Sequence, residues 1–314
     1  MLRCCDGALR VSQVSSAQRR ATVRAQGSFV RACELDVAVR KPGNVSRVSP
    51  GHGMQWGVFS ASARASAEPL FRPGARVGER IEAAVAATFA AVGCNTNLGI
   101  LLLCAPVARA IELQPEIHGP VALRAAIEAV LVDLDLHDAR AAYRAIASAR
   151  PGGLGTASTE DVHGAPSVDL RAAMALAAER DSIARQYRDG YAELFELGLP
   201  PLTGGWVSDF MSPEESPPST VTAAVQRVYL AFLAHLPDSH IVRKHGAIVA
   251  HSVMRSAQAW HARASAGANL DADPDFAAWD LELKAAGLNP GTSADLTVAA
   301  LFVAGLVIHR SPTG

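Results

Sequence analysis

The residues with the clearest chemical potential lie in a short polar run near the C-terminus, 289–295, which reads Asn-Pro-Gly-Thr-Ser-Ala-Asp. The run directly precedes an apolar helical pattern. Pro and Gly favour a turn, and Thr292 or Ser293 can cap the helix that follows. One such residue is enough for a cap, and the free N–H groups of a helix N-terminus attract anions. We therefore expect Gly291, Ser293 and Asp295 to belong to a phosphate or nucleotide site.

Two other polar runs stand in the same kind of position before apolar helical patterns. Cys94 to Asn97 precedes the most apolar segment of the chain, and Asp238 to His240 precedes a third helical pattern. Polar groups that enter a core have to be hydrogen-bonded, and one asparagine would satisfy a helix start. The additional donors and acceptors indicate either ligand contacts or further structural bonds. The candidate ligand-binding residues from these two helices are Asn95, Thr96, Asn97, His240 and Lys244.

The basic side chains after Asp238 favour phosphate over a metal ion. His240 and Lys244 are four residues apart, so they lie near one face of the predicted helix. His240 and His251 would stand about 16 Å apart along the axis, which is too far to share one metal. A cationic face for phosphate fits this spacing, and so does a capped helix with an exposed basic turn.

Two long loops rich in Gly, Pro and Ser carry further polar residues. The first contains Lys41, Asn44 and His52 around Pro and Gly residues, and the second contains Asp161 and His163 after a Gly-Gly-Leu-Gly run. Loops of this length in a compact domain are usually functional or disordered. In the functional interpretation, Lys41 and Asn44 bind a phosphate, and the second loop supplies the carboxylate of Asp161 and the imidazole of His163 for catalysis. The alternative is an ordinary turn and a surface loop.

The elements that have to position these residues are predicted to be helices throughout. Apolar residues recur with the helical period of 3.6, Ala, Leu and Arg are common, and no alternating strand series is evident. The fold class is therefore all-α, with a single domain over 26–314 behind a poorly ordered extension over 1–25. The predicted helical segments are 81–92, 98–111, 121–132, 138–147, 167–197, 220–236, 241–264, 274–286 and 293–309.

Composition narrows the functional class. The formal net charge of −1 gives no general reason to expect nucleic acid or an anionic membrane as a partner. The five cysteines include no CxxC pair, which favours a reducing cytoplasm over a disulfide framework or a zinc site. The longest apolar runs are too short to span a bilayer. We therefore expect a cytoplasmic protein whose partners are small nucleotides, with a homodimer as one possibility.

The polar runs occur in the order found in triphosphoribosyl-dephospho-CoA synthases. Lys-Pro-Gly comes first, then Asn-Thr-x-x-Gly before an apolar helix, then a Gly-rich loop, and finally Ser-Ala-Asp after Pro-Gly. The sequence resembles this family over residues 28 to 308, most specifically at Lys41 to Gly43, Asn95 to Gly99 and Asn289 to Asp295. The resemblance implies an all-α enzyme that moves the triphosphoribosyl group of ATP to the 2′-hydroxyl of dephospho-CoA and releases adenine.

The resemblance also implies ATP as a substrate and Mg²⁺ as its companion. Glycosyl transfer passes through a cation-like state, and a carboxylate such as Asp295 or Asp161 could either stabilise that state or take the acceptor proton. Lys41 and Lys244 would hold the triphosphate. Mg²⁺ would use one or two carboxylates, for which Asp161 and Asp238 are candidates.

Two alternatives remain open at this point. The chain has Asn95-Thr96-Asn97-Leu98 where the family pattern has Asn-Thr-His-Lys, and the loop around His52 lacks the acids of that pattern. A hydrolase that cleaves a ribosyl bond would use the same pocket with water as acceptor. A non-catalytic nucleotide-binding protein would keep the pocket without converging carboxylates.

Overall fold

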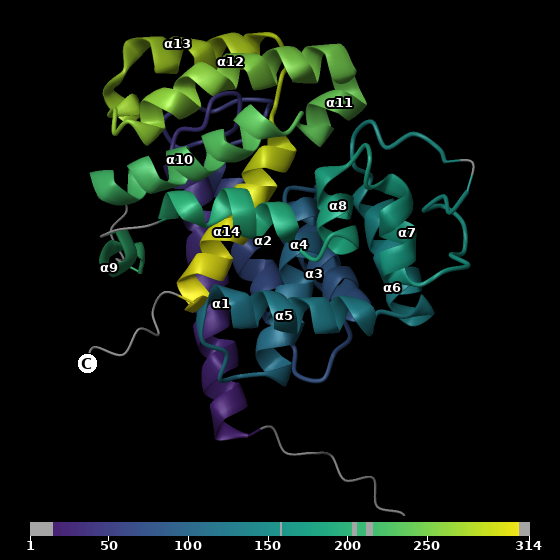
Figure 1. Cartoon of the computed structure of the whole chain (residues 1–314). Coiled ribbons are helices and arrows are strands. Elements are labelled where there is room, and N and C mark those ends of the chain that lie inside the picture. Colours follow the sequence, from purple (N-terminus) through teal and green to yellow (C-terminus); the bar gives the residue numbers. More distant parts are fainter. Residues whose placement is uncertain (1–14, 158, 203–205, 212–215, 308–314) are drawn as a thin grey trace, which may run out of the picture.

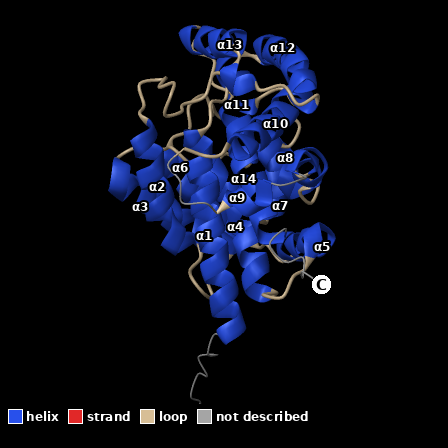
Figure 2. Cartoon of the chain, turned by 90° about the vertical axis from the view of Figure 1, so that its left-hand side faces the viewer, coloured by secondary structure: helices blue, strands red, loops and turns tan. Residues whose placement is uncertain are grey.

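The computed structural model describes residues 15–157, 159–202, 206–211 and 216–307, and all regular elements in these ranges are helical. The all-α prediction is confirmed (Figure 1, Figure 2). The helices are α1 Ser16–Ala38, α2 Trp56–Leu70, α3 Val77–Val92, α4 Leu98–Leu113, α5 Gly119–Val132, α6 Leu136–Ala149, α7 Leu170–Ala177, α8 Ser182–Arg188, α9 Trp206–Phe210, α10 Ser219–His235, α11 Ser239–His245, α12 Ala247–Ser265, α13 Pro274–Ala285 and α14 Gly291–Val307. Short helical turns are η1 Leu194–Gly198, η2 Pro200–Leu202 and η3 Leu270–Ala272.

Two apolar helices, α4 and α14, form the centre of the larger core. Residues 292 to 307 of α14 are buried on every face except at Asp295. Phe29 of α1, Phe71 and Phe302 of α14 pack edge to face, with ring centroids 5.9 to 6.0 Å apart. Each buried phenylalanine contributes about 1.5–3 kcal/mol through removal of apolar surface from water. The prediction of a central buried helix over 98–111 is confirmed by α4.

A proline lies inside α4 without ending it. Pro106 has no N–H, so the carbonyl of Leu102 loses its partner four residues along the helix. The hydroxyl of Tyr187 donates to that carbonyl at 2.7 Å, and the hydroxyl of Tyr191 donates to the carbonyl of Leu103 at 2.7 Å. Tyr187 of α8 therefore supplies the hydrogen bond that the helix itself cannot make, and Tyr191 adds a bond to the next carbonyl.

A smaller apolar cluster joins α10, α11, α12 and α13 at the end of the molecule that is uppermost in Figure 1. Trp260 stacks on Trp279 with ring centroids 6.0 Å apart, and Phe276 meets Trp260 edge to face at 5.1 Å. This cluster fixes α13 beside the loop that follows α1.

Two predicted helices are each divided in the structure. The segment 167–197 breaks after α7, because Asp181 starts a new helix by accepting hydrogen bonds from the N–H groups of Ile183 and Ala184. The segment 241–264 breaks at Gly246, whose φ of 85° is incompatible with a continuous helix.

The folded domain also begins earlier than predicted. Helix α1 begins at Ser16 behind the N-cap Ser15, and its residues Ala21 and Ala25 are buried. Residues 16–25 therefore belong to the helical domain, because they bury apolar surface against it. The remainder of the predicted extension, residues 1–14, lies outside the described residues.

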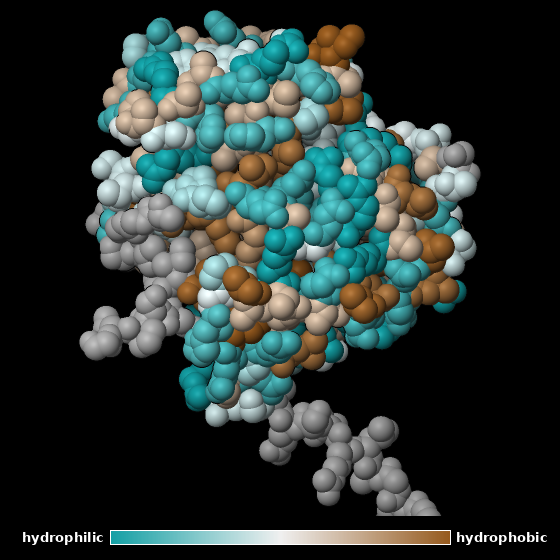
Figure 3. Space-filling view, in the orientation of Figure 1, coloured by the Kyte–Doolittle hydropathy of each residue, from teal (hydrophilic) through white to brown (hydrophobic). Residues whose placement is uncertain are grey.

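The surface mixes hydrophilic and apolar side chains (Figure 3). Around α8 it is hydrophilic, and there Arg188 pairs with Glu179 and Asp189 while Arg185 pairs with Glu193. No helix in the described part of the chain is both long and apolar enough to cross a lipid bilayer.

Candidate functional site

A cavity of about 1020 Å³ opens where the first turns of α4, α8, α11 and α14 meet the loops that follow α1 and α6. It brings together polar residues that are far apart in the sequence. The predicted site residues that line it are Asn44, His52, Asn95, Thr96, Asp161, His240, Lys244, Gly291 and Asp295. The predicted residues Lys41, Asn97, His163, Asp238 and Ser293 do not line it.

Asp295 is the carboxylate in the cavity that the protein leaves unengaged. Within the described residues it makes no hydrogen bond or ion pair, and its side chain is partly exposed only because it faces the cavity. Burial raises the pKa of Asp295 well above its usual range, and the nearby charges of Asp36 and Asp238 raise it further. A carboxylate with a raised pKa is a stronger base than an ordinary one.

Gly99 explains how Asp295 fits against α4. A Cβ atom at position 99 would lie 2.1 Å from Oδ2 of Asp295 and 2.8 Å from Cδ1 of Ile183. Any side chain here would displace the carboxylate. The carboxylate of Asp295 in the Ser-Ala-Asp run therefore requires a glycine at position 99 of the Asn-Thr-x-x-Gly run.

The other carboxylates at the cavity are held by protein groups. Asp161 accepts from the N–H groups of Ala157 (2.7 Å) and His163 (2.8 Å), and these bonds lower its pKa. Asp181 caps α8 and binds Nη1 of Arg243 at 2.6 Å. Glu160 accepts from Ser167 and Tyr143, and Asp36 pairs with Lys41. Acids with pKa values shifted in opposite directions, as in Asp161 and Asp295, suit different roles in one reaction.

The cavity also contains cations without acidic partners. Lys244, Arg150 and Arg180 line it, and none of them forms an ion pair within the described ranges. The Gly-rich loop packs directly on α11, because a Cβ at Gly152 would lie 2.8 Å from Cε of Lys244. A Cβ at Gly153 would lie 2.9 Å from the carbonyl oxygen of Arg243, and this residue has a φ of 75°. The result is an electropositive wall that suits a polyanion.

His240 lies on the same wall. Its Nε2 atom is buried and has no hydrogen-bond partner in the described structure, and its ring packs on Gly291. Burial lowers the pKa of His240 to about 4, and the charges of Lys244 and Arg243 act in the same direction. The imidazole is therefore neutral at pH 7, so it contributes a hydrogen bond rather than a charge to a ligand.

Lys41 does not reach the cavity, which corrects its predicted role as a phosphate ligand. Its side chain is 0% exposed, and Nζ lies 3.0 Å from Oδ1 of Asp36. The turn behind it is fixed by the N–H of Gly43, which donates to Asp280 at 2.8 Å. The turn instead presents Asn44, whose Nδ2 donates to Asn289 at 2.9 Å, and His52, whose Nε2 lies 2.8 Å from the carbonyl oxygen of Gly43.

The polar side chains of the run before α4, Cys94 to Asn97, mostly make hydrogen bonds within the protein. Nδ2 of Asn97 donates to Ser66 at 3.2 Å, and its Oδ1 accepts from Thr88 at 3.0 Å. Asn97 is buried by these contacts and does not face the cavity. Oδ1 of Asn95 accepts from the N–H of Leu98 at 3.2 Å, and Thr96 donates to Ser62 at 2.6 Å. Only Asn95 and Thr96 of this run remain at the cavity wall.

The predicted metal pair, Asp161 and Asp238, does not converge. Asp238 is 2% exposed, and both of its oxygens accept hydrogen bonds from the starts of α11 and α14. Ser293 is buried against it, so neither residue faces the cavity. No group of three or more His, Cys, Asp or Glu side chains in the described ranges could hold a metal ion. His163 is exposed and bonds Asp161 only through its backbone N–H.

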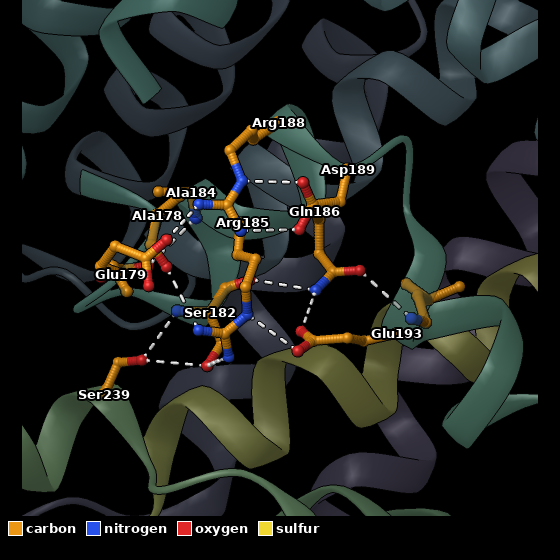
Figure 4. A network of polar contacts seen from close by, with 12 residues as sticks. Ala178, Glu179, Ser182, Ala184, Arg185, Gln186, Arg188, Asp189, Glu193 and Ser239 are labelled. Carbon is orange, nitrogen blue, oxygen red and sulfur yellow. Dashed lines mark hydrogen bonds and ion pairs between the residues drawn. The ribbon is translucent and has the colours of Figure 1, made fainter. Parts of the chain in front are cut away.

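The predicted site residues did not include Asp181, Arg243, Arg150, Arg180 or Gly99, although Gly99 belongs to the Asn95 to Gly99 run that carries the family resemblance. The wall that carries Asp181 is fixed by the network in Figure 4, in which Arg185 donates to Glu193 at 2.8 Å and Gln186 donates to the same carboxylate at 2.7 Å. The N–H of Ser182 donates to Oγ of Ser239 at 2.9 Å, which joins α8 to α11. A helix-starting Asp-Ser pair was the signal for the break at Asp181.

The CitG family model, described as ATP:dephospho-CoA triphosphoribosyl transferase, matches residues 23–312. The chain belongs to this family. A protein from Archaeoglobus fulgidus, assigned as a triphosphoribosyl-dephospho-CoA synthase, has a similar crystal structure with a TM-score of 0.55 and 21% identity. The match covers 78% of this chain and 96% of that chain, and it supports the common fold. A search of curated proteins gives no match. The resemblance to the CitG family is confirmed, and the protein is an enzyme of the transferase class.

Proposed function

We propose that the cavity binds ATP and an acceptor of the dephospho-CoA type, and that the triphosphoribosyl group passes from adenine to the acceptor's 2′-hydroxyl. The observation that carries this proposal is that the cavity holds both the Asp295 carboxylate and three cations, and that none of these four groups forms an ion pair within the described ranges. Several carboxylates line the cavity, which favours an enzyme over a binding protein without chemistry.

The reaction breaks the bond between C1 of the ribose and N9 of adenine, and forms a bond between C1 and the acceptor oxygen. Adenine leaves with a proton, and the acceptor hydroxyl loses one. Asp295 would stabilise the cation-like state at C1 and take the hydroxyl proton, because its raised pKa makes it a competent base. The neutral His240 would donate or accept a hydrogen bond at the same wall.

The triphosphate would lie along Lys244, Arg150 and Arg180. Arginine forms paired hydrogen bonds with phosphate oxygens, and lysine acts as a compact charge. The close contact between the Gly-rich loop and α11 narrows this part of the cavity, so phosphates can approach the backbone.

Mg²⁺ would accompany ATP mainly through phosphate oxygens. Magnesium at such sites uses one or two carboxylates and keeps several waters. Asp161 lines the cavity and would share its two oxygens between Mg²⁺ and the N–H groups of Ala157 and His163, whereas Asp238 is buried away from the cavity. No step of the reaction depends on this assignment, since the base and the cationic wall come from the chain itself.

The test is adenine release from ATP and Mg²⁺ by the purified protein, followed by chromatography with and without dephospho-CoA. Adenine that appears only with dephospho-CoA supports the transferase and its acceptor together. Asp295→Asn should reduce the rate by about two to four orders of magnitude, the usual contribution of a positioned base. Asp275→Asn, at an exposed position of α13, is the matched control and should behave as the wild type.

Other outcomes would change the proposal. Adenine release without any acceptor would identify a hydrolase. Full activity in Asp295→Asn would remove Asp295 as the base. Stabilisation by ATP without adenine release would leave a nucleotide-binding protein.

A further inference from the structure

Asp238 joins the starts of the two helices that carry the polar residues of the cavity. Its Oδ1 accepts from the backbone N–H groups of His240 at 2.9 Å and Ile241 at 3.1 Å, in the first turn of α11. Its Oδ2 accepts from the backbone N–H of Ser293 at 2.7 Å and from its hydroxyl at 2.8 Å, in the first turn of α14. One buried carboxylate therefore caps two helices at once.

This arrangement exceeds what a helix cap requires. The capping residue Asp273, for comparison, accepts from the N–H groups of Asp275 and Phe276 at the start of α13, and its other oxygen pairs with the Arg263 side chain of α12 rather than with a second helix start. At Asp238 the second oxygen accepts hydrogen bonds from the start of a second helix, α14. The N–H of His240 also lies 3.1 Å from Oγ1 of Thr292, which closes the junction from the other side.

We propose that Asp238 is a positioning residue that fixes Asp295 relative to the phosphate-binding face of α11. This inference rests on the proposed function, in which Lys244 of α11 holds the triphosphate while Asp295 of α14 acts at C1 of the ribose. Both ends of one substrate have to be held at the same time. A misplacement of about 1 Å between such groups can cost about 100-fold in rate.

The charge of Asp238 also acts on Asp295. Three backbone N–H groups and the Ser293 hydroxyl donate to the Asp238 carboxylate and favour its ionised form, whereas burial raises its pKa. Its negative charge raises the pKa of Asp295. Loss of this charge would therefore lower that pKa. The other titratable groups that act on Asp295 or feel its charge are Asp36 and Cys33 of α1, Cys104 of α4, Asp181 before α8, and Arg243 of α11.

The variant Asp238→Asn separates the bonds that Asp238 makes to the start of α11 from those that it makes to the start of α14. Asparagine is a good N-cap, so its oxygen can still serve α11. Its NH₂ group would then face the backbone N–H of Ser293, so the backbone bond to α14 would be lost, while the Ser293 hydroxyl can turn and accept from that NH₂ group. Asp273→Asn is the matched control, because it changes a cap at the start of one helix, α13, together with an ion pair to Arg263 of α12, and neither lines the cavity.

The first readout does not depend on turnover. In Asp238→Asn, amide hydrogen exchange at Ser293 should become faster while the amides of His240 and Ile241 stay protected. Unchanged exchange at Ser293 would overturn the inference even if the wild type releases no adenine. If Asp238→Asn does not fold, Ser293→Ala, which removes only the hydroxyl donor, should give a smaller change in the same direction.

The second readout is kinetic and uses the adenine assay. We expect kcat of Asp238→Asn to fall by about 100-fold, with little change in KM for ATP and with the acidic limb of the pH profile moved to lower pH. Asp273→Asn should show none of these changes. The positioning role would be refuted if the wild type is active and Asp238→Asn keeps either the wild-type kcat or the wild-type acidic limb of the pH profile. The proposed function would be unaffected by that result.

Discussion

Replacing Lys41 by methionine should destabilise the fold and leave ATP binding intact. The side chain of Lys41 is 0% exposed, and that of its partner Asp36 is 9% exposed. Methionine keeps most of the aliphatic stem and removes the charge. The carboxylate of Asp36 would then be buried without its cation.

The expected loss is about 3–5 kcal/mol, the usual cost of removing one partner from a buried ion pair. This is a large part of the about 5–15 kcal/mol by which proteins are usually stable. Burial already raises the pKa of Asp36, and Lys41 opposes that shift. Without Lys41 the pKa rises further. An acid whose pKa is raised in the folded state binds its proton more tightly there, so it favours the folded state as pH falls. The loss in free energy of unfolding of Lys41→Met relative to the wild type should therefore become smaller below neutral pH.

Urea unfolding at neutral and acidic pH would measure this loss, and the adenine assay would give KM for ATP. The double variant Asp36→Leu with Lys41→Met should recover much of the stability, because no unpaired charge remains. If Lys41→Met raises KM for ATP at least tenfold while the urea midpoint stays at the wild-type value, Lys41 is a phosphate ligand after all and the structural argument fails.

Three further outcomes follow from the cavity. Gly99→Ala should lose about 1–3 kcal/mol of stability from overpacking and should also lower kcat, because its Cβ would lie 2.1 Å from Asp295; thermal unfolding and adenine release would show this, with Gly57→Ala, which has open space, as control. Lys244→Met should raise KM for ATP at unchanged melting temperature, and a KM equal to the wild type would remove Lys244 from the phosphate wall. The rate should fall as pH drops through the raised pKa of Asp295, and a limb in the ordinary carboxyl range would contradict its role as base.

The sequence was a good guide to the helices and to the order of the polar runs. Periodicity predicted α3, α4, α10, α13 and α14 within a few residues, since these helices bury continuous apolar surface. It was weaker at the breaks. A helical pattern continues across Asp181 and Gly246 because both flanking segments are amphipathic on their own, and only the cap and the positive φ divide them.

The residues of the candidate site could be predicted only in part. Residue type shows that a side chain needs polar partners, but not where those partners come from. Asn97 bonds Ser66 and Lys41 pairs with Asp36, both inside the protein, whereas Asp295 has no such partner in the part of the chain that the structure describes. Arg150 and Arg180 gave no signal, because an arginine at a helix end is ordinary until the fold turns it toward a cavity.

The proline in α4 has a consequence for how the protein folds. The carbonyl of Leu102 that Pro106 leaves without a donor is buried in the core, and an unsatisfied buried carbonyl costs about 1–3 kcal/mol. Helix α4 is therefore a poor folding nucleus by itself, in spite of its hydrophobicity. It becomes stable when Tyr187 and Tyr191 dock, and these tyrosines bring with them the segment that begins at Asp181. The wall of the cavity and the centre of the core are thus one cooperative unit, and the site cannot open by local unfolding of α8 without a penalty in α4.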